Sequence, residues 1–243
     1  MIFSFSKIKT IHDCPLKYKK YYIDKLRLPS GEPAIFGQAI HKLFKDIVEK
    51  NIERPKAIGM WKSYFINETV GNDESITVLP KNNFWMTKGY PVINVFYKHL
   101  PEFKIKKIIS LEKRYEAKYG EHDVVLVTDM IYEDTDGKIV LADYKTGKEK
   151  ELDYYQLQFY KDRVGVKIDT CKLYYTFKGI TEFEVDKYKE ETEKYIDDGL
   201  KILTSGNFFK NVKKECKYCY FYKNKTCDAK KGEEGEDVNQ KEI

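Results

Sequence analysis

The sequence has little arginine and no long apolar segment. Only four residues are arginines, so lysine supplies nearly all of the positive charge behind a formal net charge of +5. This mildly basic balance permits a polyanionic partner without requiring one. No stretch approaches the roughly 18 apolar residues that cross a membrane, and the N-terminal residues lack the apolar core of a secretion signal. We therefore expect a cytoplasmic protein with no membrane partner.

The sequence also lacks a phosphate-binding loop of the form Gly-x-x-x-x-Gly-Lys-Ser/Thr, so we expect no nucleotide-driven motor within it. Core-forming residues, in contrast, are abundant: 42% of the 243 residues are hydrophobic and 15% are aromatic. This composition can form one substantial domain. We predict a single domain over residues 1–228, with a helical insertion over 30–100 and a disordered, charged tail over 229–243.

The stretch that ends at Gly147 contains a predicted β-hairpin. Two β-rich runs, Val124–Tyr132 and Lys138–Lys145, flank a polar segment, which is typical of two strands and a turn. The segment Thr135-Asp136-Gly137 suits a three-residue loop in which the glycine adopts the left-handed conformation.

A loop centred on Asp136 places Asp129 directly opposite Asp143. Because side chains alternate between the two faces of a strand, Lys145 then lies on the same face as both carboxylates. A two-residue turn would instead place Asp129 opposite Tyr144 and separate the carboxylates. The register of the hairpin therefore decides whether these side chains form one site.

Paired carboxylates beside a lysine suit metal-dependent hydrolysis. Carboxylates bind hard divalent cations such as Mg²⁺, which lower the pKa of bound water and stabilise charge on a phosphate under attack. A lysine can orient or deprotonate that water, or offset the phosphate charge. An Asp-x-Lys sequence alone is more often part of a solvated strand face, so the neighbouring motifs decide between the two interpretations.

These motifs resemble those of a known family. Asp129, followed by the string Asp143-Tyr144-Lys145-Thr146-Gly147, resembles the PD-(D/E)XK nuclease superfamily, and the string is most similar to its RecB-like branch of phage and CRISPR-adaptation exonucleases. The resemblance implies an α/β fold with a central mixed β-sheet flanked by helices. It also implies an N-terminal helical part and a cysteine cluster that joins the two ends of the chain.

His41 and Glu112 extend the resemblance. A lone helical histidine is usually structural, but Gly37-x-x-x-His41 matches the RecB-like motif whose histidine binds the catalytic metal. Gly37 would let its helix approach the sheet closely. Glu112 resembles the glutamate on the family's first core strand, although its alternative role is an exposed strand carboxylate. Glu116 is a competing choice, because a period of two places it on the same face.

The resemblance thus implies a set of ligands and catalytic groups. One or two Mg²⁺ or Mn²⁺ ions would be bound by His41, Asp129, Asp143 and the Tyr144 carbonyl. Lys145, Asp129, Asp143 and Glu112 would be the catalytic residues, with the lysine positioning the attacking water.

Gln156 and Tyr160 lie four residues apart on one face of a predicted helix. Gln-x-x-x-Tyr after the DYKTG string resembles the branch-specific motif that lines the DNA path. The alternative is a pair of amphipathic residues on a half-buried helix. We favour DNA binding, because the pair directly follows the string.

Four of the five cysteines form a second motif. Cys216-x-x-Cys219 is followed by Cys227, and Cys14 lies near the N-terminus. Four thiolates suit either a tetrahedral zinc ion or an iron–sulfur cluster, and their spacing alone leaves both open. The layout of one distant cysteine and three near the C-terminus resembles that of the iron–sulfur RecB-like nucleases. This resemblance favours a [4Fe-4S] cluster with a structural role.

The remaining segments predict further elements by their periodicity. Tyr18, Tyr22 and Leu26 share one stripe of an N-terminal helix and are expected to lie in the core. Helices are also predicted over 34–50, 54–70, 83–100, 152–164 and 186–204, and strands over 105–119, 170–178 and 183–185.

We therefore predict a metal-dependent deoxyribonuclease. It would be an exonuclease that hydrolyses phosphodiester bonds at DNA ends or in single strands, in DNA repair, recombination or CRISPR adaptation. The alternative is a non-catalytic iron–sulfur DNA-binding subunit of a nuclease–helicase or spacer-acquisition complex, which would bind DNA without turnover. DNA is the expected partner. Any unwinding of DNA would come from a partner protein, either a helicase or a protein of recombination or CRISPR adaptation. The sequence also leaves open whether the protein forms a homo-oligomer.

Overall fold

The structure is a computed structural model, and the residues that it describes are 2–26, 31–70 and 83–227. The chain divides into two compact units, which are residues 1–3 with 29–193, and residues 4–28 with 194–243. The predicted tail over 229–243 lies outside the described residues, and the predicted boundaries of a single domain stay predictions.

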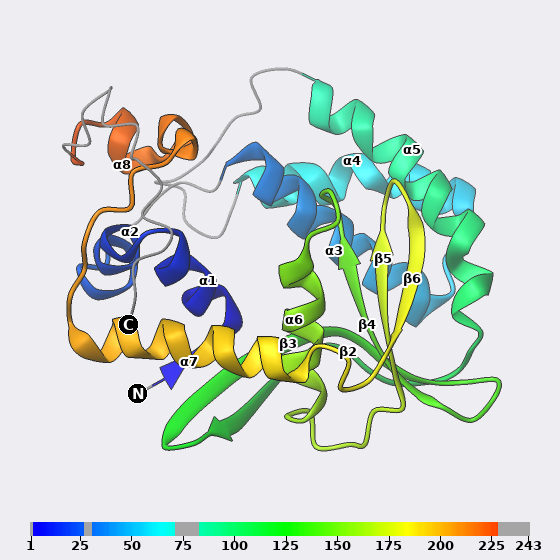
Figure 1. The fold of residues 1–243 in the computed structure, drawn as a ribbon. Coiled ribbons are helices and arrows are strands. Elements are labelled where there is room, and N and C mark those ends of the chain that lie inside the picture. The colour runs from blue at the N-terminus through cyan, green and yellow to red at the C-terminus, as the bar shows by residue number, and fades with distance from the viewer. Residues whose placement is uncertain (1, 27–30, 71–82, 228–243) are drawn as a thin grey trace. The chain divides into compact units, whose positions relative to one another are not determined.

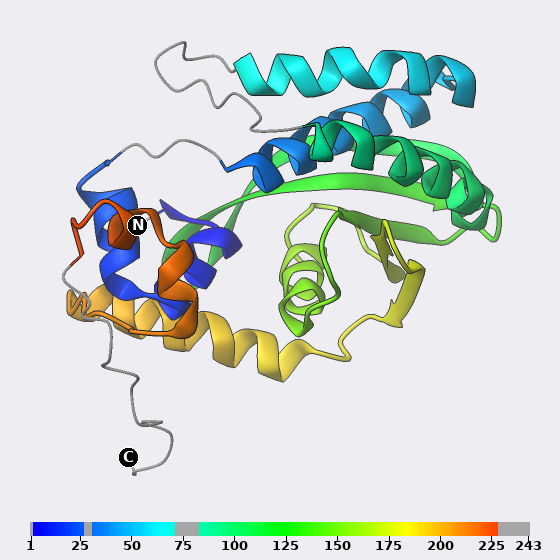
Figure 2. The ribbon, with the colours of Figure 1, turned by 90° about the horizontal axis from the view of Figure 1, so that it is seen from above.

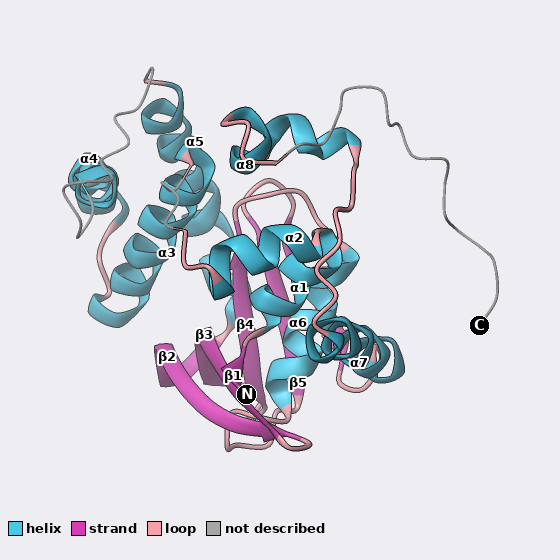
Figure 3. Ribbon diagram, turned by 90° about the vertical axis from the view of Figure 1, so that its left-hand side faces the viewer, coloured by secondary structure: helices cyan, strands magenta, loops and turns pink. Residues whose placement is uncertain are grey.

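A six-stranded mixed sheet forms the centre of the first unit. Its strands are β1 (Ile2–Phe3), β2 (Ile105–Tyr119), β3 (His122–Asp134), β4 (Ile139–Lys145), β5 (Thr170–Tyr175) and β6 (Gly179–Glu184). The pairs β2–β3, β3–β4 and β5–β6 are antiparallel, whereas β4–β5 and the short β1–β3 contact are parallel. Figure 3 shows β3, β4 and β5 side by side in this sheet.

Helices cover both faces of the sheet, as Figure 2 shows. One face carries α3 (Glu32–Lys50), α4 (Arg54–Val70) and α5 (Phe84–His99), the last followed by a 3-10 turn, η3 (Leu100–Phe103). The other face carries α6 (Glu151–Lys161), which connects the parallel strands β4 and β5. The predicted mixed α/β fold with flanking helices is therefore confirmed.

The core lies between α3 and the centre of the sheet. The apolar face of α3 recurs at helical spacing and is buried, and it packs with apolar side chains of β3 and β4. Phe44 of α3 stacks on Phe96 of α5, with ring centroids 3.7 Å apart. Gly89 of α5 lies so close to Trp61 that an added Cβ would fall 2.0 Å from the indole ring. This packing fixes the position of α3 over the strands that carry the candidate site.

The hairpin of β3 and β4 has the predicted loop and register. Gly137 adopts the left-handed conformation with φ +81°, and its amide donates to the carbonyl of Asp134. Met130 pairs with Ala142, so the next residues, Asp129 and Asp143, lie opposite each other. The prediction of a three-residue loop, and with it the facing carboxylates, is confirmed.

The second unit contains residues from both ends of the chain. Its helices are α1 (Phe5–Asp13), α2 (Pro15–Tyr18), the π-helix η1 (Lys19–Ile23), the 3-10 helix η4 (Lys214–Tyr218) and α8 (Tyr220–Lys223), and α7 (Lys189–Ser205) has residues in both units (Figure 1). None of the described helices is both long and apolar enough to cross a membrane.

One prediction for this unit is wrong. Tyr18 is buried, but Leu26 is 43% exposed rather than part of the core. The helix changes to π geometry at Lys19 and ends at Ile23, so the spacing of 3.6 residues per turn does not extend to Leu26.

Candidate active site

Three side chains from one helix and two neighbouring strands meet at one place in the first unit. His41 comes from α3, Glu112 from β2 and Asp129 from β3, and one donor atom of each lies within 4.8 Å of the other two. The Nδ1 atom of His41 is 3.3 Å from Asp129 Oδ1 and 3.8 Å from Glu112 Oε1. No other group of this kind occurs among the described residues.

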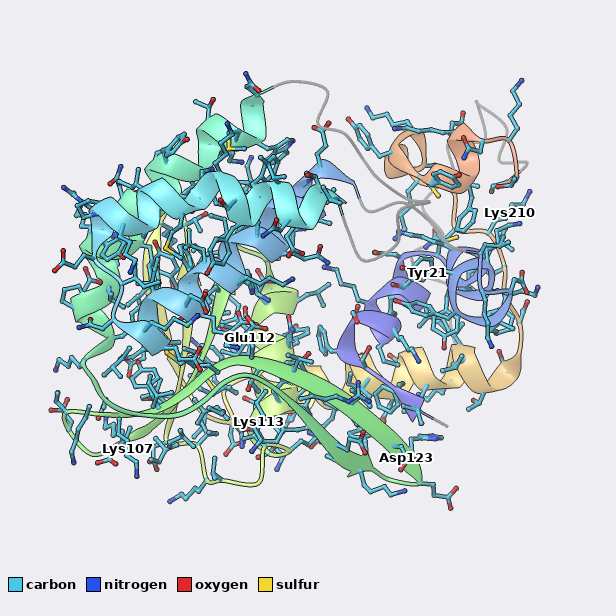
Figure 4. All side chains as sticks on the ribbon, turned by 180° about the vertical axis from the view of Figure 1, so that it is seen from behind. Tyr21, Lys107, Glu112, Lys113, Asp123 and Lys210 are labelled. Atoms are coloured by element: carbon cyan, nitrogen blue, oxygen red, sulfur yellow. The ribbon has the colours of Figure 1, made fainter. Side chains whose placement is uncertain are left out.

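Glu112 reaches this group because the backbone of β2 is irregular there. Its φ is +45°, in the left-handed region that a glutamate in a strand rarely adopts. Before Glu112, Ser110 is buried whereas Ile109 is exposed; from Tyr115 onward, the odd-numbered residues are the less exposed ones. Figure 4 accordingly shows Glu112 on the side of β2 that faces the helices and Lys113 on the opposite side. The conformation therefore turns this carboxylate toward His41.

Glu116 does not share the face of Glu112. Its side chain is 76% exposed and pairs with Arg114. The prediction that a period of two places both glutamates on one face is wrong, because the phase of β2 changes between them.

The two aspartates have different partners. The amide of Tyr144 donates to Asp129 Oδ2 at 2.6 Å, which fixes the carboxylate that faces His41. Asp143 instead forms an ion pair with Lys145, whose Nζ lies 2.7 Å from Asp143 Oδ2. Asp143 is thus outside the group of three donors, although both aspartates are buried. Whether Asp143 and the Tyr144 carbonyl bind a metal stays a prediction.

The charged groups of the site shift one another's pKa values. Burial lowers the pKa of His41, but the attraction of Asp129 and the other nearby carboxylates outweighs it and raises that pKa to about 9. Burial and the charge of Asp129 raise the pKa of Glu112 to about 7. Burial would also raise the pKa of Asp129, but the adjacent His41 holds it below its ordinary value.

Asp143 and Lys145 also change each other's pKa values. Burial raises the pKa of Asp143 to about 6, although Lys145 opposes the shift. Burial would lower the pKa of Lys145, but the charge of Asp143 keeps it above its ordinary value. Lys145 is therefore an ammonium at neutral pH in the metal-free protein.

Gln156 and Tyr160 form a chain of hydrogen bonds that begins at Lys145. Lys145 Nζ donates to Gln156 Oε1 at 2.8 Å, and Gln156 Nε2 donates to the Tyr160 hydroxyl at 3.1 Å. Tyr160 is buried, so its hydroxyl holds the glutamine in place. The structure therefore connects this predicted DNA-binding pair to the lysine, and DNA contact by these two residues stays a prediction.

Sequence reasoning missed Asp153. This residue lies in the first turn of α6, with Oδ1 4.0 Å from Lys145 Nζ and Oδ2 accepting a hydrogen bond from the Tyr175 hydroxyl at 3.1 Å. An acidic residue in a first helical turn ordinarily stabilises the helix end, so nothing in the sequence pattern indicated a contact with the lysine.

The donors of the three-residue group fit a divalent cation. Two carboxylates and one imidazole supply oxygen and nitrogen ligands. The Oε1 atom of Glu112 is buried and accepts no hydrogen bond from the described residues, which leaves it available to an ion. Gly37 lies near Thr146, but an added Cβ would meet its Oγ1 at an ordinary 3.4 Å. The position of α3 therefore does not depend on a glycine there.

A separate cavity in the second unit brings the predicted cysteines together. Cys14, Cys216, Cys219 and Cys227 all line a cavity of about 430 Å³, and none forms a disulfide. No three of these sulfur atoms lie within 4.8 Å of one another. Cys171 is the fifth cysteine, and it is buried in β5 as expected of a small apolar residue.

Comparisons with known proteins identify a family and similar solved structures. A family model described as the PD-(D/E)XK nuclease superfamily matches residues 2–223. Among solved structures, a candidate exonuclease from Eubacterium rectale is similar at 9% identity and a TM-score of 0.56, covering 91% of this chain and 86% of that one. The structure of SSO0001 covers 90% of this chain and 97% of its own, at 15% identity and a TM-score of 0.38. No curated protein sequence matches the chain.

Proposed function

Because the chain belongs to the PD-(D/E)XK nuclease superfamily, we propose that it is a metal-dependent deoxyribonuclease that acts as an exonuclease on DNA ends or single strands. The convergence of His41, Glu112 and Asp129 beside Lys145 is the observation that carries this proposal. The similarity to a candidate exonuclease supports the nuclease fold, and the preference for ends or single strands is our inference.

The donor set would hold Mg²⁺ or Mn²⁺ through His41, Glu112 and Asp129, with Asp143 as a further candidate ligand. A bound cation of this kind supplies an acidified water and offsets negative charge on the phosphate. The amide of Tyr144 keeps Asp129 in place for metal binding. This amide donates a hydrogen bond to Asp129 Oδ2, whereas His41 faces Asp129 Oδ1.

Lys145 would orient the attacking water and neutralise charge that develops on the phosphate. The charge of Asp143 holds the pKa of Lys145 above its ordinary value, which favours the ammonium form that can donate to the water and to the phosphate. Asp143 and Gln156 hold its ammonium from two sides, which restricts the side chain before substrate binds.

Cleavage of end-labelled DNA with Mg²⁺ or Mn²⁺ tests the proposal. We expect Lys145→Ala to lower the rate by about 10²- to 10⁴-fold, the range typical of a positioned proton donor or acceptor. Lys148→Ala is the matched control, because Lys148 is an exposed lysine on the following loop. A Lys145→Ala protein that cleaves as fast as the parent would refute the proposal, and binding without turnover in any divalent metal would favour the non-catalytic alternative.

We also propose that the cavity lined by four cysteines binds a [4Fe-4S] cluster with a structural role. Sulfur atoms around one zinc ion lie about 3.8 Å apart, because each Zn–S bond is about 2.3 Å long. The four cysteines share one cavity, and no three of their sulfur atoms lie within 4.8 Å of one another. A cubane cluster binds each thiolate through a different iron atom, so it suits more widely spaced sulfurs.

Anaerobic purification distinguishes the two metals. A cluster predicts a brown protein with broad absorbance near ~400 nm and matching amounts of iron and sulfide. A colourless protein that contains one zinc ion would overturn the cluster and leave the nuclease proposal unaffected.

A further inference from the structure

A group of aromatic side chains surrounds one lysine in the first unit, outside both candidate metal sites. Lys88 Nζ lies 4.6 Å from the ring centroid of Trp85 and 5.0 Å from that of Phe177. The rings of Phe36 and Phe84 follow at 5.6 Å and 5.8 Å. These five residues, here named the Lys88 cluster, come from α3, α5 and the turn between β5 and β6.

Two properties of the Lys88 cluster indicate a ligand. Phe177 is 61% exposed. It lies in a tight turn, in which the Lys178 amide donates to the Tyr175 carbonyl at 3.0 Å. A large exposed aromatic ring gains free energy when a flat partner covers it. Among the described residues, the ammonium of Lys88 lies over four aromatic rings and forms no ion pair with a carboxylate. It therefore retains the capacity to neutralise an anion.

The Lys88 cluster lies close to the candidate active site. Tyr175 pairs with Lys145 across the parallel strands, and the Thr176 amide donates to the Lys145 carbonyl at 3.0 Å. Phe177 directly follows Thr176, and Phe36 precedes Gly37, whose added Cβ would lie 3.4 Å from the Oγ1 atom of Thr146, the residue after Lys145. Figure 1 shows this β5–β6 turn beside α5. A strand whose phosphate lies beside Lys145 could thus reach Phe177 within a few nucleotides.

We infer that the Lys88 cluster is a binding subsite for one unpaired nucleobase and the adjacent phosphate of single-stranded DNA. Base stacking on aromatic rings is independent of sequence and needs the face of the base to be free, which excludes a base inside an intact duplex. Lys88 would neutralise the phosphate beside that base. This inference rests on the proposed function, because it assumes a DNA strand in the active site.

Binding of single-stranded oligonucleotides tests the subsite. Fluorescence anisotropy is measured with a chelator present, so that no cleavage occurs, on a series of oligonucleotides that each lack one base at successive positions. We expect the parent protein to lose affinity by about 5- to 150-fold at one position, which corresponds to one stacked base. The Phe177→Ala protein should bind the intact oligonucleotide more weakly by a similar factor and should be insensitive to the missing base.

Three further variants separate stacking from structural damage. Phe177→Tyr retains a ring and should restore the affinity and the sensitivity of the parent. Lys88→Met should reduce the slope of log affinity against log salt by about one, the value for one lost phosphate contact. Tyr90→Ala is the matched control, because Tyr90 is 36% exposed and lies two residues beyond Lys88, on another side of α5.

The outcomes distinguish the two proposals. A Phe177→Ala protein that binds every oligonucleotide as the parent does would overturn the subsite, while DNA cleavage by the parent in Mg²⁺ or Mn²⁺ would leave the nuclease proposal intact. A parent protein that neither binds nor cleaves DNA would overturn the nuclease proposal, and the subsite with it.

Discussion

The two candidate metal sites of this protein are built in different ways. In the first unit, adjacent strands and one packed helix hold the donors of His41, Glu112 and Asp129 within 4.8 Å of one another. In the second unit, Cys14 precedes a short helix and the other three cysteines lie in or beside short helices and turns. These thiols line a cavity of about 430 Å³ instead of converging on one point.

The difference predicts how strongly each site depends on its ligand. Two long hydrogen-bonded strands position the oxygen donors and the packed helix α3 positions the nitrogen donor before any ion binds, so the first site should persist without metal. Four-residue and five-residue helices have little stability of their own, and metal binding to thiolates contributes directly to folding free energy. The first unit should therefore lose activity when its metal is removed, and the second should lose structure.

The largest effect should come from Asp129→Asn. Removing this charge weakens the binding of the cation and should lower DNA cleavage by at least about 10³-fold, which corresponds to several kcal/mol of lost transition-state stabilisation. Cleavage rates and Mn²⁺ binding by electron paramagnetic resonance measure the effect. Asp123→Asn, an exposed carboxylate on the same strand, is the control and should retain activity. If the two variants cleave equally fast, the first site is not the catalytic centre.

Cys219→Ser should separate the two sites. We expect the absorbance near ~400 nm to disappear and the second unit to become sensitive to proteolysis, because the thiolate ligands stabilise the fold when they bind metal. Mn²⁺ binding in the first unit should stay within about twofold of the parent, a margin of less than ~0.5 kcal/mol. Cys171→Ala, outside the cavity, should keep the absorbance. Retained absorbance in Cys219→Ser would remove this cysteine from the ligand set.

Metal affinity of the first site should rise with pH. His41, with a pKa raised to about 9, and Glu112, with a pKa raised to about 7, must both lose protons before they bind a cation. Between pH 7 and 9 the imidazole alone remains to be deprotonated, so the Mn²⁺ dissociation constant should fall by about tenfold per pH unit. Titration calorimetry in buffers of different ionisation enthalpy measures the released protons. A His41→Asn protein with the same slope would contradict the assignment.

The smallest effects should come from two glycines that test the packing around the first site. Gly89→Ala should destabilise the first unit by about 1–3 kcal/mol, because its Cβ would overlap the indole of Trp61. Gly37→Ala should instead stabilise the fold by about 0.5–1 kcal/mol, since alanine favours the helix and has room beside Thr146. Urea denaturation measures both. A destabilising Gly37→Ala would restore the prediction that this glycine is needed for close approach.

Much of the first unit could be predicted from the sequence because its signals are local. Alternating strand residues and the glycine at the left-handed loop position determine the β3–β4 register. The strand over 105–119 and the helix over 54–70 have the predicted bounds. Register then brings Asp129 and Asp143 face to face, so their facing positions followed from spacing, whereas their metal-binding role was implied by the family resemblance.

The rest of the site depended on effects that local patterns do not contain. The choice between Glu112 and Glu116 follows from one irregular backbone angle, and the contact of Asp153 with Lys145 follows from the way α6 packs against β4 and β5. The division of the chain into two compact units likewise depends on long-range contacts. None of these features changes the periodicity of the sequence, so none could be read from it.

The backbone angle at Glu112 has a consequence for how this protein can vary. Left-handed geometry costs a glutamate about 1 kcal/mol more than it costs glycine. Glu112→Gly should therefore relieve that conformational penalty while deleting the carboxylate that faces His41. At this position, selection for thermal stability and selection for catalytic turnover would act in opposite directions. Random mutagenesis followed by selection for stability alone should therefore recover a stabilised but inactive variant here.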